Sequence, residues 1–91
     1  MLAKLRIKER ILVDRLGVMF HDWFVPTEKK GRYTFDDGQA ASVKQFLRQL
    51  PPIEVEDAIE IACSRKTQLS AAWKYFCGIC WNKIKERNGG A

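Results

Sequence analysis

The segment "WKYFCGIC", residues 73–80, contains the pair of side chains most able to do chemistry, Cys77 and Cys80. Two cysteines at this spacing can bind zinc, form a redox dithiol, or lie in a core as small apolar residues. A zinc site needs two further ligands at tetrahedral distance, and the chain offers only Cys63 and His21. A redox pair needs an accessible thiolate, typically at a helix N-terminus, whereas this pair falls in the middle of an apolar helical pattern. We therefore expect both cysteines in the core, with no bound metal and no cofactor.

No other combination of side chains suggests catalysis. His21 has Asp22 beside it, but adjacent residues on a helix point in different directions. The sequence contains no glycine-rich phosphate loop and no paired-carboxylate motif. The acidic segment "IEVEDAIE", residues 53–60, is typical of a helix N-terminus, where carboxylates interact favourably with the helix dipole. Alternatively, it offers a docking surface to a basic partner. We expect a protein that is not an enzyme.

The distribution of charge indicates where a partner would bind. The net charge is +5 and the pI is about 9.3, values compatible with binding to nucleic acid or to an acidic protein surface. Both ends of the chain are basic, and residues 53–60 between them are acidic. The candidate phosphate-binding residues lie near the C-terminus and in a loop: Lys83, Lys85, Arg87, Lys29, Lys30 and Arg32.

Within the C-terminal group, Lys83 and Arg87 are one helical turn apart and share a face, which favours this pair for adjacent phosphates. A solvated basic surface that only keeps the protein in solution is the alternative. Trp81 lies beside these cations, and we expect it to stack on a base or to anchor a partner.

Hydrophobic periodicity predicts an all-α fold, a small bundle of about four helices. The predicted helices span residues 2–24, 37–50, 52–66 and 69–87, and residues 25–36 form one long loop. Asp36 or Asp37 is the predicted N-cap of the second helix, and Thr67 or Ser70 that of the fourth. The predicted apolar stripe of the first helix contains Leu5, Leu12, Leu16, Met19, Phe20 and Trp23. The predicted buried stripe of the last helix contains Trp73, Phe76, Cys77, Cys80 and Ile84.

Length and composition predict one helical domain over residues 1–87, followed by a disordered tail, residues 88–91. No apolar run approaches the roughly 20 residues of a membrane span, and no signal-peptide pattern follows the basic start. Three cysteines, an odd number, argue against a disulfide framework. We therefore expect reduced thiols, no membrane association and a cytoplasmic location.

A longer pattern carries a family resemblance. "LPPIEVEDAIEIACSRK", a short connector and "WKYFCGICWNKIKERNG" together resemble the C-terminal half of the DnaD-like domain of bacterial and phage replication-initiation proteins. Tyr75 and Ile79 match the family's spacing of Tyr, Ile and Trp, whereas Lys83 stands where the family has Trp, and Trp81 comes two residues earlier. The resemblance covers roughly residues 18–87. It implies an α-helical module that binds DNA weakly, contacts replication proteins and has no cofactor.

Three hypotheses of function follow. The first is a non-catalytic nucleic-acid-associated module, with DNA favoured over RNA, related to DNA replication and encoded by a phage or mobile element. The second is a small adaptor or inhibitor that binds a protein of a nucleic-acid machine. The third, an enzyme or metalloprotein, depends on Cys77 and Cys80 alone.

Overall fold

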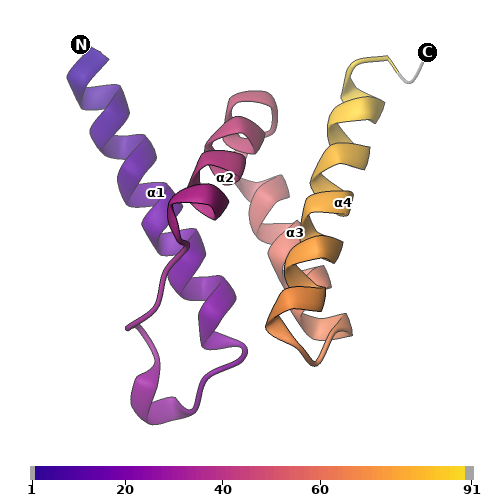
Figure 1. Cartoon of the computed structure of the whole chain (residues 1–91). Coiled ribbons are helices and arrows are strands. Elements are labelled where there is room, and N and C mark those ends of the chain that lie inside the picture. The colour runs from indigo at the N-terminus through magenta and orange to yellow at the C-terminus, as the bar shows by residue number, and fades with distance from the viewer. Residues whose placement is uncertain (1, 90–91) are drawn as a thin grey trace. The chain divides into compact units, whose positions relative to one another are not determined.

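The computed structural model describes the backbone of residues 2–89 and the side chains of residues 8–89. Within this part of the chain there is no strand, and the elements in order are α1 (Leu2–Asp22), the 3-10 helix η1 (Thr27–Lys29), α2 (Asp37–Gln49), α3 (Pro52–Arg65) and α4 (Leu69–Arg87) (Figure 1). The predicted all-α fold with four α-helices is confirmed. The chain divides within α2 into two compact units, the first of residues 1–44 and the second of residues 45–91.

In the first unit, α1 buries a narrow row of side chains. Val13, Leu16 and Phe20 are each at most 2% exposed. Their spacing of three and four residues is that of one helix face. Trp23, the last residue of the predicted stripe, is 49% exposed and lies one residue beyond the end of α1 at Asp22. The predicted side-chain position of Leu5 lies outside the described residues.

A capping box starts α2. The backbone N–H of Gln39 donates to Oδ1 of Asp36 at 2.8 Å, and the backbone N–H of Asp36 donates to Oε1 of Gln39 at 3.2 Å. This reciprocal pair satisfies two backbone donors that a helix start otherwise leaves unpaired. Of the two predicted caps, Asp36 is therefore the one used.

In the second unit, α3 packs along α4 (Figure 1). Pro52 occupies the first turn of α3, where its missing N–H costs nothing. The side chains of α3 that are buried are Val55, Ala58, Ile59, Ala62 and Cys63. Those of α4 are Ala72, Phe76, Cys80 and Ile84. Phe46 of α2 belongs to the same unit, with its ring centroid 5.8 Å from that of Phe76 in an edge-to-face arrangement.

The predicted buried stripe of α4 was too wide. Its buried positions recur at every fourth residue from Ala72 to Ile84, and Trp73 and Cys77 are only half-buried. Each of these two follows a buried position by one residue, which on an α-helix turns the side chain by about 100° away from the core. Apolar character alone could not distinguish the buried row from its neighbours.

The ends of α4 also differ from expectation. Its N-cap is Gln68, without a side-chain cap hydrogen bond, rather than Thr67 or Ser70. After the helix, Asn88 and Gly89 form a turn in which the N–H of Asn88 donates to the carbonyl of Ile84 at 3.0 Å. The remainder of the predicted disordered tail, residues 90–91, lies outside the described residues. None of the helices in residues 2–89 has the length and apolarity needed to cross a bilayer.

Candidate nucleic-acid interface

The predicted loop between α1 and α2 is fixed to α1 by specific hydrogen bonds. Oδ1 of Asp22 accepts a hydrogen bond from the N–H of Gly31 at 2.8 Å. The Thr34 hydroxyl donates to the carbonyl oxygen of Asp14 at 3.1 Å. Gly31 has a φ of +82°, a left-handed conformation that a residue with a Cβ rarely adopts. The loop is thus tied to the helix at both its middle and its end.

Close packing on a glycine brings the end of this loop onto α1. A Cβ atom at Gly17 would lie 2.6 Å from the backbone nitrogen of Phe35 and would also collide with the Thr34 hydroxyl. The absence of that Cβ lets the loop backbone lie directly on the helix. Phe35 is consequently buried, with its ring centroid 5.8 Å from that of Phe20.

The three predicted loop cations lie in η1 or within three residues after it. The single turn of η1 is closed by hydrogen bonds from the N–H groups of Lys29 and Lys30 to the carbonyls of Pro26 and Thr27, at 2.9 and 3.3 Å. Lys29, Lys30 and Arg32 are all exposed. Among the described residues, none of these three cations takes part in an ion pair. The loop therefore presents positive charge that its own unit does not neutralise.

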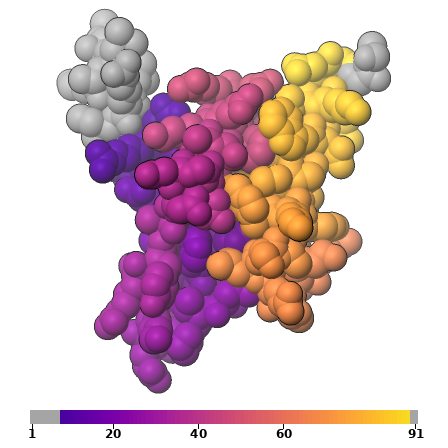
Figure 2. Space-filling view, in the orientation of Figure 1, coloured from indigo at the N-terminus to yellow at the C-terminus, as the bar shows by residue number. Residues whose placement is uncertain are grey.

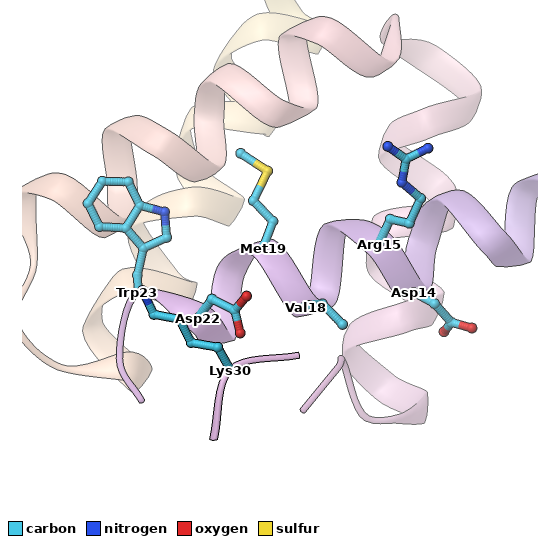
Figure 3. Close-up of a pocket in the computed structure, with 7 residues that line it drawn as sticks. All are labelled: Asp14, Arg15, Val18, Met19, Asp22, Trp23 and Lys30. Atoms are coloured by element: carbon cyan, nitrogen blue, oxygen red, sulfur yellow. The ribbon is translucent and has the colours of Figure 1, made fainter. Parts of the chain in front are cut away.

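An open groove of about 840 Å³ runs along α1 beside this loop (Figure 3). Arg15, Met19 and Trp23 follow one another at one-turn intervals and project to the same side of the helix (Figure 3). The remaining lining residues are Asp14, Val18, Asp22 and Lys30. The lining holds two carboxylates and two cations, one of which is Lys30 of the loop, so its formal charges sum to zero.

The structure places the predicted pair in α4, Lys83 and Arg87, opposite carboxylates of α3. Nζ of Lys83 lies 3.7 Å from Oδ2 of Asp57, and Nη1 of Arg87 lies 3.5 Å from Oε2 of Glu54. These distances describe ion pairs rather than short hydrogen bonds. The acidic segment and two of the basic residues that follow it in sequence thus neutralise each other within the protein, which reduces the positive potential available to a phosphate.

Lys85 and Trp81, the other two predicted residues of α4, lie on its outer face, the side of the helix that points away from Lys83 and Arg87. Lys85 is exposed, and Trp81 is 46% exposed. The indole of Trp81 meets Phe46 with ring centroids 5.3 Å apart and an interplanar angle of 85°. Figure 2 shows that side chains of α4, coloured orange to yellow, form much of the visible face of the second unit.

Sequence reasoning missed a group of cations at the connection between α3 and α4. Nη1 of Arg65 donates to the Tyr75 hydroxyl at 3.3 Å, and Nζ of Lys66 lies 5.2 Å from the centroid of the same ring. Both cations are exposed, as is Lys74. In the sequence these cations appear as "SRK" before a short connector and "WKY" after it. Only the packing of α3 against α4 brings Arg65 and Lys66 to the ring of Tyr75.

None of the three cysteines forms a disulfide bond, and all three lie among the described residues. Burial raises the pKa of Cys77 to about 11 and that of Cys63 to about 12. Burial, together with the neighbouring Cys77, also raises the pKa of Cys80 to about 12. At neutral pH all three groups are protonated, a state that is a weak nucleophile and a weak metal ligand.

The one histidine of the chain is held by contacts with its own helix and with the loop that follows it. Nδ1 of His21 lies 2.8 Å from the carbonyl oxygen of Gly17, and its ring contacts that of Phe35 at a centroid distance of 6.0 Å. Across the described residues, no three His, Cys, Asp or Glu side chains are grouped so that they could hold a metal ion. No protein-family model, curated protein or solved structure matches this chain.

Proposed function

We propose that this protein is a non-catalytic helical module that associates with nucleic acid, DNA in preference to RNA. The observation that carries the proposal is the ordered loop that presents Lys29, Lys30 and Arg32 without carboxylate partners. Lysine and arginine side chains supply most non-specific affinity for nucleic acid by neutralising phosphates and releasing counterions. Because the loop is already fixed on α1, binding loses less conformational entropy than ordering a mobile loop would.

Exposed aromatic rings at the two ends of the loop support the same proposal. Trp23 precedes the loop cations and is 49% exposed, and Tyr33 follows them and is 44% exposed. Aromatic rings beside cations are the usual composition of surfaces that bind nucleic acid through both bases and phosphates. Glu28 is the only carboxylate among residues 27–32, which leaves this segment positive.

A salt titration of binding to duplex DNA tests the proposal. Lys29→Gln with Lys30→Gln removes two phosphate contacts, so the negative slope of log affinity against log salt should become shallower by about 1.8. Lys8→Gln with Arg10→Gln is the matched control, because it removes the same charge from exposed positions of α1 in the same unit. Equal slopes for the loop variant and the wild-type protein would refute the proposed site.

A protein partner is the second candidate, and the groove along α1 favours it. Met19, Val18 and Trp23 are the apolar side chains that line the groove, and side chains of both charges line the rest of it. Exposed apolar area with a polar rim is typical of sites that bind other proteins. Absence of measurable binding to DNA and RNA at low salt would support this candidate over the first.

The resemblance of residues 18–87 to DnaD-like domains supports a more specific role in DNA replication, as a product of a phage or mobile element acting in the cytoplasm. Deleting the gene and measuring the copy number of the replicon that encodes it tests the link to replication. Cell fractionation tests the location.

A further inference from the structure

A straight row of side chains runs along the outer face of α4. Lys74, Trp81 and Lys85 are separated by seven and four residues, so on an α-helix they point in nearly the same direction. At a rise of about 1.5 Å per residue, the Cα atoms of Lys74 and Lys85 are about 16 Å apart, with Trp81 between them. All three are exposed. Among the described residues, neither of these lysines forms an ion pair, in contrast with Lys83.

Gly78 leaves the helix surface beside the indole bare. Gly78 lies one turn before Trp81 in α4, on the side toward which helical side chains lean. A Cβ atom added at Gly78 would meet nothing within 4 Å. The glycine therefore serves no close packing in the structure, although a glycine inside a helix is destabilising. The surface of α4 one turn before Trp81 therefore carries no side chain at position 78.

The contact of Trp81 with Phe46 holds the indole in place without covering it. The two rings are nearly perpendicular, at 85°, and 46% of Trp81 remains exposed. A fixed, half-exposed indole loses little conformational entropy when a planar group stacks on it. Cations on either side along the helix add the charge that a phosphate backbone requires.

We infer that the outer face of α4 binds an unpaired base of single-stranded nucleic acid, stacked on Trp81, with the flanking phosphates contacted by Lys74 and Lys85. The inference rests on the proposed function and adds to it the type of strand and a second contact surface. Bases in a duplex are stacked on each other and have no free face for an indole, so this surface distinguishes single strands from double strands. The paired cations on the other side of α4 contribute little.

The test compares two fluorescently labelled single strands of equal length and charge, an oligo-deoxythymidine and the same strand with its bases replaced by abasic sites. Fluorescence anisotropy gives the affinity of each strand for the full protein. The wild-type protein should bind the strand with bases about tenfold more tightly, since stacking on an aromatic side chain stabilises binding by about 1–3 kcal/mol per base and 1.4 kcal/mol is tenfold.

Two variants of Gly78 separate base stacking from protein stability. Gly78→Leu adds a long side chain one turn before Trp81, where it obstructs a base approaching the indole, and should weaken the preference for the strand with bases. The melting temperature should rise, because leucine is a far better helix former than glycine. Gly78→Ala is the matched control: it also raises the melting temperature, but its single methyl group leaves the ring accessible and the preference intact. Trp81→Phe should retain a reduced preference for the strand with bases. Lys74→Gln with Lys85→Gln should make the negative salt slope for single strands shallower by about 1.4.

The outcomes distinguish this inference from the proposed function. Equal affinity of the wild-type protein for both strands, or a full preference retained by Gly78→Leu, overturns the stacking site. If the Lys29→Gln, Lys30→Gln variant still shows a reduced salt slope for duplex DNA, the proposed function stands without it. Absence of binding to every strand at low salt overturns both, and leaves the outer face of α4 to a protein partner.

Discussion

The two glycines inside long helices should respond to alanine in opposite directions. Gly17 lies in α1 and Gly78 in α4, and in each helix alanine is intrinsically more favourable than glycine by about 1 kcal/mol. At Gly78 nothing lies within 4 Å of the added Cβ, so Gly78→Ala should stabilise the protein by most of that 1 kcal/mol. At Gly17 the added Cβ would lie 2.6 Å from the backbone nitrogen of Phe35, and backbone cannot rotate away as a flexible side chain can.

The cost at Gly17 follows from what the loop would lose by moving. Displacement breaks the hydrogen bond from Thr34 to the carbonyl of Asp14, which contributes about 1 kcal/mol. It also exposes part of Phe35, which is 7% exposed in the structure and whose complete burial stabilises the fold by about 1.5–3 kcal/mol. After the gain in helix propensity, Gly17→Ala should destabilise the protein by about 1–2 kcal/mol.

Thermal and urea unfolding followed by circular dichroism measures both variants. For a domain of this size 1 kcal/mol corresponds to about 4–8 °C, so Gly78→Ala should melt about 5 °C higher and Gly17→Ala about 10 °C lower than the wild-type protein. If the two units unfold separately, each shift should appear in the transition of its own unit alone, which also tests the prediction of a single domain. A Gly17→Ala protein at least as stable as wild type would refute the packing of the loop on α1.

Three further predictions concern the second unit. Cys80→Ala should cost about 1–2 kcal/mol and Cys77→Ala less, because Cys80 is completely buried and Cys77 only half-buried; equal losses in urea unfolding would contradict this. Alkylation of Cys77 by iodoacetamide should accelerate about tenfold per pH unit from pH 7 to 9, since its pKa is raised to about 11 by burial and the thiolate fraction keeps rising; a plateau near pH 8.5 would contradict it. A double-mutant cycle of Lys83→Gln and Asp57→Asn should give a coupling below about 1 kcal/mol that decreases with salt, because Asp57 is 55% exposed.

The ion pairs between α3 and α4 change how binding experiments on the C-terminal cations should be designed. Reversing Lys83 to glutamate would place two carboxylates opposite each other, so a loss of binding could follow from repulsion within the protein. Neutral glutamine at Lys83 and Arg87 avoids that repulsion. We expect such a variant to bind nucleic acid nearly as well as wild type, because α3 already neutralises these two cations.

The sequence by itself determined the helices and most of their boundaries. Periodic apolar residues, the Asp36 cap and the proline pair at residues 51–52 are local signals, and a helix is built from contacts between residues three and four apart. The predicted spans for α2, α3 and α4 agree with the structure to within one residue at each end. The residue types of the candidate surface, exposed loop cations and a tryptophan in the last helix, could also be read directly from the chain.

Tertiary structure decided which of those residues are available to a partner. The sequence does not show which group lies opposite a charged side chain. Lys83 forms an ion pair with Asp57 and Lys85 forms none among the described residues, although the two lysines are two residues apart. Likewise, Gly17 and Gly78 both stand between apolar residues inside a helical pattern, yet a loop lies on Gly17 and nothing lies within 4 Å of a Cβ at Gly78. The physical reason is that pairing and close approach join segments far apart in the chain, whose alignment depends on how the helices pack and not on local propensity.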